Sequence, residues 1–335
     1  METNKSIAQA GLLPRFRRGT ELIIRRSIYP YLEFPYHRFH IWRMKRRIRM
    51  QGELATIRRD FISTHGVCPN LENPQTFGEK LAWIKHHVRD PLMTTCADKY
   101  AVRQYVKETV GEKYLIPLLG VYEDPREIAF ADLPIPFVLK VNHASGGNVF
   151  CMDSTSFNAT RAIRVLRHHL KINPYYYGCE WAYKDIPPRI VCETVLVDEK
   201  NERPSDYKVF CFNNEPLLIQ VDVNRFTDHR RNFYDQQWRL LPLRLLYSNA
   251  TGDVPRPDCL EEMLEIARRL SGHFDFARVD LYNIRGKVYF GEITFYPEGG
   301  SSQFQPPRYE IEYGEKLKLT CLSADELAGV RATRS

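Results

Sequence analysis

Two carboxylates near the C-terminal end of the chain have the placement of a metal site. Asp280 and Glu292 lie in the apolar runs RVDL and YFGEI, which flank the turn sequence YNIRGK with Gly286 at its tip. The runs predict an antiparallel hairpin, and strand alternation puts both acids on one face, roughly 5 Å apart if they are cross-strand neighbours. Mg²⁺ binds one or two carboxylates together with phosphate oxygens and water. The pair therefore predicts a magnesium site that holds a phosphorylated ligand.

The same hairpin places Arg278 beside Asp280, and Thr294 beside Glu292. Arg278 could meet a phosphate oxygen, or it could form a salt bridge with one of the acids on a solvated sheet face. A buried carboxylate without a partner costs free energy, so either the acids are neutralised or their positions are not buried.

A glycine-bearing loop offers a second phosphate-binding element. In VLKVNHASGGNVF, Lys140 ends an apolar strand, and a short polar loop at 143–148 leads into the next strand. Gly146 and Gly147 allow backbone N–H groups to point at an anion, and Lys140 adds a positive charge beside them. The loop therefore suits a polyphosphate, although the GxxxxGKS or GxxxxGKT phosphate loop is absent. An ordinary hairpin turn with a surface lysine is the alternative.

Further polar residues interrupt later apolar runs. Glu193 in RIVCETVL could hydrogen-bond an adenine and a ribose, or it could be an edge-strand acid that faces solvent. Lys208 shares a strand face with Asp206 in SDYKVFCF and could contact a nucleotide or an acyl intermediate. The segment VDVNRFTDHRRNFYDQQW has arginines that could clamp a carboxylate or uronic acid, or lie in a solvated loop. These arginines are Arg225, Arg230 and Arg231.

The elements that must position these residues follow from the hydrophobic pattern. NPQTFGEKLAWIKHHV predicts a capped amphipathic helix, and ADKYAVRQYVKETVG predicts a second one with Asp98 as N-cap and Gly111 at its end. From about residue 136 the pattern changes to short β-rich runs. Two helices, NATRAIRVLRHHLK and DCLEEMLEIARRLSGH, interrupt these runs. The sequence thus predicts an α+β fold with a helix-rich first third.

Composition and cysteine usage indicate an ordinary globular protein of a reducing compartment. The 335 residues are 43% hydrophobic and 27% charged, and the eight cysteines show no CxxC spacing. We therefore expect reduced cysteines and a cytoplasmic protein. No apolar run reaches the roughly 18 residues of a membrane-spanning helix, and the N-terminus lacks the apolar core of a signal peptide.

The net charge of +7 is concentrated near the N-terminus. Residues 15–49 hold eleven lysines and arginines against Glu21 and Glu33, interleaved with large apolar residues such as Trp42. This basic arm could lie on an anionic membrane surface, grip an acidic polymer, or be a helical extension docked on the body. We expect no nucleic-acid partner.

The order of these motifs is similar to that of the ATP-grasp superfamily. NPQTFGEKLAWIK, ADKYAVRQYV, FVLKVNHASGG, SDYKVFCFNNEP and GEITFYPEGG together resemble the TupA-like ATP-grasp family of bacterial surface-polysaccharide and teichuronopeptide synthesis. The resemblance covers about residues 70 to 320. It implies two α+β subdomains that grip ATP, preceded by a helical basic extension. The expected segments are a basic arm (1–60), a helical N-terminal region (61–135), a small subdomain with the glycine loop (136–185), a C-terminal subdomain with the metal site (186–325) and a tail (326–335).

The resemblance also implies roles for single residues. Asp280 and Glu292 would bind Mg²⁺, together with Thr294, which stands where superfamily members often have asparagine. The ribose would contact Asp198 or Glu199. Phosphate, loop and adenine contacts would come from Lys99, Lys140, His143, Ser145, Gly146, Gly147, Asn148, Glu193, Thr194, Val195 and Leu196. Metal and substrate, rather than the protein, would then neutralise the two hairpin acids.

The chemistry that the resemblance implies is amide formation. A carboxylate attacks the γ-phosphorus of ATP, and an amine then displaces phosphate from the acylphosphate. Lys140, Lys208 and Arg278 would stabilise the developing charge, with the arginines at 225, 230 and 231 on the substrate. The expected partners are a carboxylate-bearing glycan or its precursor and an amine donor. The alternatives are a glycosyltransferase that uses a sugar nucleotide, and a non-catalytic, ATP-binding assembly factor at the membrane surface.

Overall fold

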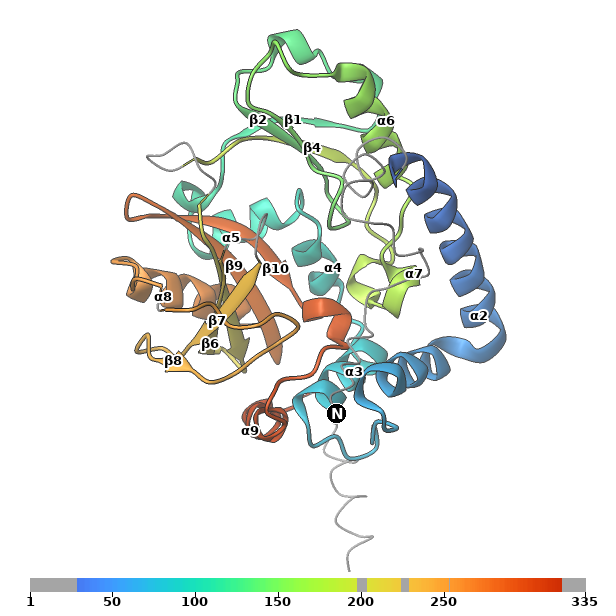
Figure 1. Ribbon diagram of the computed structural model, residues 1–335, viewed down its shortest axis with the longest axis vertical. Coiled ribbons are helices and arrows are strands. Elements are labelled where there is room, and N and C mark those ends of the chain that lie inside the picture. The colour runs from blue at the N-terminus through green and yellow to red at the C-terminus, as the bar shows by residue number, and fades with distance from the viewer. Residues whose placement is uncertain (1–28, 198–203, 224–228, 253, 321–335) are drawn as a thin grey trace, which may run out of the picture.

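The computed structural model describes the chain from residue 29 to residue 320, apart from 198–203, 224–228 and 253, with side chains from residue 38 onward. Its strands form two antiparallel sheets, around which the helices pack (Figure 1). The smaller sheet has the order β1-β4-β2-β3, and the larger sheet has the order β10-β9-β5-β6-β7-β8. The predicted α+β class is confirmed.

The bounds of the elements are as follows. The strands are β1 (Leu118–Tyr122), β2 (Phe137–Val141), β3 (Val149–Cys151), β4 (Ile190–Thr194), β5 (Asp206–Phe212), β6 (Glu215–Val223), β7 (Arg230–Tyr234), β8 (Leu240–Leu241), β9 (Phe276–Ile284) and β10 (Lys287–Thr294). The α-helices are α2 (Tyr29–His65), α3 (Phe77–His87), α4 (Pro91–Ala97), α5 (Val102–Thr109), α6 (Ala159–His169), α7 (Tyr175–Gly178), α8 (Leu260–Ser271) and α9 (Arg308–Lys316). The 3-10 turns are η1 (Glu112–Tyr114), η2 (Pro125–Glu127), η3 (Phe130–Asp132), η4 (Trp181–Tyr183) and η5 (Pro297–Gly300).

The smaller sheet buries an apolar face against α6. Phe137 and Leu139 of β2 and Ile190 of β4 pack with Leu166 of α6 in a core cluster of their own. Strand β4 lies between β1 and β2, so its backbone pairs on both sides. The interpretation of Glu193 as an edge-strand acid in solvent is therefore wrong, because the residue lies on an inner strand and is only 8% exposed.

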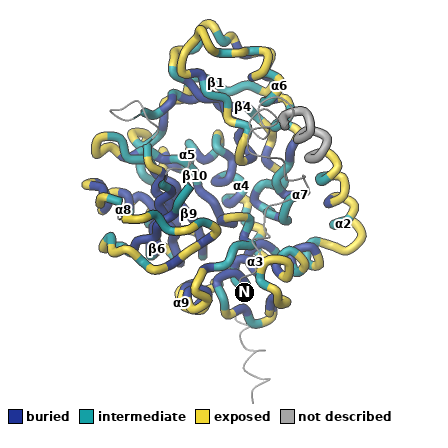
Figure 2. The backbone as a smooth tube through the Cα atoms, in the orientation of Figure 1, coloured by how far each residue is buried: buried dark blue, intermediate teal, exposed yellow. Residues whose placement is uncertain are grey.

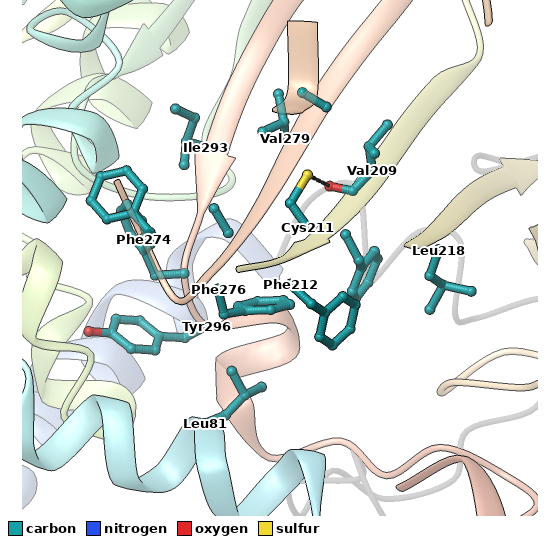
Figure 3. Packing of buried hydrophobic residues seen from close by; sticks show 14 of the residues in the cluster. Leu81, Val209, Cys211, Phe212, Leu218, Phe274, Phe276, Val279, Ile293 and Tyr296 are labelled. Carbon is teal, nitrogen blue, oxygen red and sulfur yellow. Dashed lines mark hydrogen bonds between the residues drawn. The ribbon is translucent and has the colours of Figure 1, made fainter. Parts of the chain in front are cut away.

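One face of the larger sheet changes from aromatic to polar along its strands. Phe212 of β5 and Phe276 of β9 lie side by side in the core (Figure 3). Both pack against Phe77 of α3, with ring centroids 5.6 and 5.2 Å away. The same alternation brings Lys208 and Arg278 to this face further along the strands. The aromatic half joins the main core, and the polar half becomes the floor of a cleft.

Helix α3 has the predicted start and the predicted cap. Thr76 accepts a hydrogen bond from the Glu79 N–H, and the Glu79 carboxylate accepts one from the Thr76 N–H, which is a capping box. Helix α5 differs from its prediction, because it begins at Val102 and Asp98 ends α4 instead. The Asp98 carboxylate accepts the Tyr100 N–H at 2.8 Å, so it caps the turn between the two helices.

The described part of the basic arm lies in the long helix α2, which has a kink at Gly52, where φ is 81° and ψ is 168°. Beyond the kink, Ile57 and Phe61 are buried in the main core. The helix thus continues past residue 60, the expected end of the arm. The described helices include none that is long and apolar enough to cross a membrane.

Candidate active site

A cleft of about 620 Å³ lies between the two sheets, and ionisable side chains dominate its lining. The smaller sheet and its glycine loop line one side, and the polar half of the larger sheet lines the other. The turn between α4 and α5, the segment around α7 and η4, Tyr247 and the η5 segment also contribute to the lining. The charged residues of the lining are Lys99, Arg103, Lys140, Glu180, Glu193, Asp206, Lys208, Asp222, Arg231, Arg278, Asp280, Glu292 and Glu298.

The predicted hairpin of the two acids is confirmed. Strands β9 and β10 pair in antiparallel fashion, with Asp280 directly opposite Glu292. The Arg278 guanidinium donates to both oxygens of Asp280, from Nε at 2.7 Å and from Nη2 at 2.8 Å. Nη2 also lies 3.4 Å from Glu292 Oε1 and 3.4 Å from Thr294 Oγ1. The hairpin therefore presents one linked group of side chains to the cleft.

Protein cations contact both acids, which corrects our expectation that metal and substrate alone neutralise them. Lys208 Nζ lies 3.2 Å from Asp280 Oδ2, and Lys99 Nζ lies 3.6 Å from Glu292 Oε2. The salt bridge from Arg278 is present, but in a buried cleft instead of on a solvated sheet face. The sequence pattern gave no sign of these partners, because Lys208 and Lys99 come from other segments of the chain.

The two acids differ in how open they are to the cleft. The Asp280 side chain is 4% exposed and its oxygens face Arg278 and Lys208, whereas the Glu292 side chain is 37% exposed. Burial alone would raise the pKa of Glu292, but Lys99 and Arg278 outweigh it and lower that pKa to about 2. Glu292 is therefore an ionised carboxylate available to a ligand. Among the described residues, no group of three or more acidic, histidine or cysteine side chains has the arrangement of a metal site.

A buried contact holds Lys99 against the end of β2. Asn142 Nδ2 donates to Asp98 Oδ1 at 2.9 Å, and the Lys99 N–H donates to the Asn142 carbonyl at 3.0 Å. Lys99 Nζ then reaches the Ala144 carbonyl at 3.0 Å, at the start of the glycine loop. The turn between α4 and α5 and the loop after β2 thus present their polar groups to the same part of the cleft.

The glycine loop has the backbone conformation that its sequence predicts. Gly146 and Gly147 have φ values of 84° and 67°. A Cβ atom on Gly147 would lie 2.3 Å from the His169 ring, so any side chain at this position would require His169 to shift. Ser145, Gly146 and Asn148 line the cleft. The His143 side chain is buried instead, with Nε2 at 2.7 Å from the Ile172 carbonyl, so it fixes the base of the loop.

Glu193 lies deep on the smaller sheet and binds two cations. Its carboxylate accepts from Arg103 Nη1 and from Lys140 Nζ, each at 2.9 Å. The N–H groups of Thr194 and Val195 donate to backbone carbonyls at 3.1 Å. The adenine contact of Glu193 and of the segment through Leu196 stays a prediction. In the structure, the N–H groups of Thr194 and Val195 are already bound to backbone carbonyls.

The predicted substrate arginines divide into three cases. Arg225, like the ribose candidate Asp198, lies outside the described residues. Arg230 begins β7 and is half-buried. Arg231 is 3% exposed and binds Asp222 Oδ1 at 2.7 Å and Glu298 Oε1 at 2.9 Å, so the interpretation of Arg231 as part of a solvated loop is wrong.

Several cleft residues escaped the sequence analysis. Arg103 was visible only as one polar residue in ADKYAVRQYV, and Asp222 as an acid inside the apolar run of β6. Glu298 stands in the PEGG turn with φ at 52°. Glu180 lies between α7 and η4, and burial raises its pKa to about 7, with Lys85 opposing part of the shift. Of these four residues, only Asp222 could have been found from the sequence, because an acid that interrupts an apolar strand indicates a site residue.

Three solved structures illustrate what the chain is similar to. The D-alanine–D-alanine ligase from Bacillus anthracis in complex with ATP shares 16% identity, with 60% of this chain and 54% of that chain covered and a TM-score of 0.35. The L-amino acid ligase from Bacillus licheniformis shares 12% identity, with 72% and 53% covered and a TM-score of 0.37. The ATP-grasp ligase PsnB, complexed with its minimal precursor, Mg and ADP, shares 11% identity, with 65% and 57% covered and a TM-score of 0.35. The chain thus spans about half the length of the first of these ligases.

A family model gives the stronger comparison. A search of curated proteins found no significant match. The model of the TupA-like ATP-grasp family, in contrast, matches residues 79–318, which is well over half of the chain. This range includes both sheets, the glycine loop and the hairpin of the two acids. The chain has the ATP-grasp fold and belongs to the TupA-like ATP-grasp family.

Proposed function

We propose that this protein is an ATP- and Mg²⁺-dependent ligase that joins a carboxylate to an amine through an acylphosphate. One observation carries the proposal. Lys99 and Lys140, placed beside the glycine loop, face Arg278 and Glu292 of the larger sheet across one cleft, with 3.6 Å between Lys99 Nζ and Glu292 Oε2. This arrangement combines cations for phosphate oxygens with an ionised carboxylate for a metal.

The side chains present fit magnesium and ATP. Glu292 is ionised and open to the cleft, and Thr294 Oγ1 lies 3.3 Å from its Oε1, so these two residues would hold the metal. Asp280 could join them by giving up a contact with Arg278 or Lys208, and the released cation would then be available to a phosphate oxygen. Mg-ATP supplies the electrophilic γ-phosphorus when bound.

The residues of the chain would act by position and charge. Lys140, Lys208 and Arg278 would face the charge that develops during phosphoryl transfer and would orient the attacking carboxylate. Arg230, and Arg225 from outside the described part, would bind the carboxylate-bearing substrate. Arg231 would hold Asp222 and Glu298 in place. The chemistry needs no nucleophilic side chain.

The substrate and the compartment belong to the same proposal. We assign as acid a carboxylate-bearing cell-surface glycan or its precursor, and as second substrate an amine. The sequence resemblance supports the glycan context. The seven cysteines in the described part of the chain are free thiols, which supports a cytoplasmic site of action.

Calorimetry with Mg-ATP tests the proposal. Unmodified protein is expected to bind ATP in a magnesium-dependent manner, and the variant Asp280→Asn/Glu292→Gln is expected to lose this binding. The control Glu312→Gln/Glu315→Gln removes two exposed carboxylates of α9 and should bind as the unmodified protein does. Binding would then be followed by a screen of carboxylates and amines for phosphate release.

Two other results would replace the ligase assignment. If the folded protein does not bind ATP but binds a sugar nucleotide, the glycosyltransferase alternative takes its place. If it binds Mg-ATP and no acid–amine pair releases phosphate, the protein is a non-catalytic ATP-binding factor.

A further inference from the structure

The N-terminal half of α2 exposes a continuous face of basic and large apolar side chains. Helical spacing places the exposed residues of the segment 38–50 on one side of the helix. We call this side the basic–aromatic face. It consists of Arg38, Phe39, Trp42, Arg43, Lys45, Arg46, Arg49 and Met50.

The opposite side of the same segment is docked on the body of the protein. Met44 is 2% exposed, and the His40 ring stacks on Tyr177 of α7 with 4.8 Å between centroids. Figure 1 shows the helix along the outer edge of the molecule, and Figure 2 colours much of it as exposed. Docking therefore fixes the basic–aromatic face toward solvent.

The composition of this face distinguishes it from an ordinary solvated surface. It has five cations and no acid, whereas a solvated helix face usually mixes both signs. Phe39, Trp42 and Met50 are 59%, 56% and 70% exposed. Phe39 stacks on Trp42 with 5.9 Å between centroids, and Arg46 lies over the Trp42 ring. Grouped apolar side chains of this size, left in water by the fold, mark an interaction surface.

We propose that the basic–aromatic face binds the surface of an anionic lipid membrane. The five cations match negative headgroups, and an indole, a phenyl ring and a thioether on the same face can enter the boundary between headgroups and acyl chains. A soluble acidic polymer would use the cations and leave the three apolar side chains in water. The face is about 18 Å long at the rise of an α-helix, long enough to lie along a membrane plane.

The face lies on the outside of α2, and its residues do not line the cleft. The proposed membrane binding therefore requires neither nucleotide nor ligase activity. The N-terminal segment before residue 29 adds Arg15, Arg17, Arg18, Arg25 and Arg26, so it is positively charged like the basic–aromatic face.

Sedimentation with lipid vesicles tests the proposal on the full chain without nucleotide. The vesicles are phosphatidylcholine alone, or two parts phosphatidylcholine with one part phosphatidylglycerol. We expect the unmodified protein to partition into the anionic vesicles and much less into the neutral ones. The variant Arg43→Gln/Arg46→Gln/Arg49→Gln should lower the partition coefficient on the order of 100-fold. Phe39→Ser/Trp42→Ser should lower it on the order of tenfold.

A matched control separates this face from net charge. Arg308→Gln/Lys316→Gln/Lys318→Gln removes three exposed cations on and just beyond α9, and should partition as the unmodified protein does. Equal losses in the two triple variants would overturn the proposal, as would the absence of partitioning by the unmodified protein. Binding to soluble polygalacturonate without binding to vesicles would also overturn it, and would assign the face to an acidic polymer. All substituted residues are exposed, and circular dichroism would verify that each variant is folded.

Discussion

The Arg278 guanidinium and the Asp280 carboxylate form a two-point contact within one strand, with donor–acceptor distances of 2.7 and 2.8 Å. Residues two apart in a strand share a face, so the pair forms locally and needs no other element. Lys208 of β5 then adds a third charge at 3.2 Å. Burial alone would lower the pKa of Lys208, but Asp280 and Asp206 raise it. Asp280 thus contacts two buried cations at once, and Lys208 is shared with Asp206 at 2.5 Å.

A first prediction contrasts the two hairpin acids. Asp280→Asn removes the two-point partner of Arg278, which keeps Glu292 at 3.4 Å. It also removes one of the acidic partners of Lys208, which keeps Asp206 at 2.5 Å. We expect it to lower the free energy of unfolding by roughly 3 kcal/mol. Glu292→Gln affects a side chain that is 37% exposed and should cost about 1 kcal/mol or less. Urea unfolding of both variants measures the difference. Equal losses would contradict the structural role assigned to Asp280.

A second prediction concerns pH and Glu180. Burial raises the pKa of this carboxyl group to about 7, so folding favours its protonated form. Its contribution to stability is then fully present below its ordinary pKa and is lost as the pH rises through 7. The free energy of unfolding of the unmodified protein should therefore fall from about pH 5 to about pH 8 more than that of Glu180→Gln.

The control for Glu180 is Glu312→Gln, which removes an exposed carboxylate on α9. Its pH dependence should match that of the unmodified protein, as measured by urea unfolding at both pH values. The same slope in all three proteins would show that Glu180 does not titrate as described.

A third prediction concerns a buried acid outside the cleft. Glu310 of α9 is 3% exposed and accepts the N–H groups of Gly78 at 3.0 Å and Phe304 at 2.7 Å. Glu310→Ala would leave both donors unpaired and should cost roughly 3 kcal/mol. Glu312→Ala, on the exposed side of the same helix, should change stability by about 0.5 kcal/mol or less. Thermal unfolding of the two variants decides whether Glu310 joins α9 to α3.

A fourth prediction concerns why two positions require glycine: backbone conformation alone at Gly286, and backbone conformation together with a steric collision at Gly147. Gly286 has φ at 76° with no atom within 4 Å of an added Cβ, so Gly286→Ala should cost about 1 to 2 kcal/mol from backbone conformation alone. Gly147 has φ at 67°, and an added Cβ would also collide with the His169 ring, so Gly147→Ala should cost roughly 3 kcal/mol. Chemical unfolding compares them, and similar costs would mean that His169 moves aside freely.

Local patterns were enough to predict the hairpin and the glycine loop. The two apolar runs and Gly286 predicted the hairpin, but regular alternation from the turn would set Gly291 opposite Asp280. A register shift between Phe290 and Glu292 brings Glu292 opposite Asp280, and the sequence pattern did not predict this shift. Gly146 and Gly147 likewise predict positive φ without knowledge of the rest of the chain. In each case the interaction that decides the structure lies within a few residues in the sequence.

Contacts between distant segments were not predictable in this way. Lys208 meets Asp280 across 72 residues, and Arg231 meets Glu298 across 67 residues. Strand alternation shows which way a charge points but not which opposite charge arrives from another strand. Asp98 shows a local limit of the same kind, because an aspartate can begin a helix or cap the turn after one, and its contact with Asn142 favours the turn.

Asn142 joins the end of β2 to the turn between α4 and α5 through several hydrogen bonds. Its side chain bonds Asp98, the Pro187 carbonyl and the Arg189 N–H, and its carbonyl accepts the Lys99 N–H. If these hydrogen bonds persist, Asn142 would act as the hinge of any rotation of the smaller sheet against the larger one. Lys99, beside the axis, would move least, while the far end of β2 would sweep the widest arc. As long as these bonds hold, the lysine that meets Glu292 would be displaced less from the hairpin than the far end of β2.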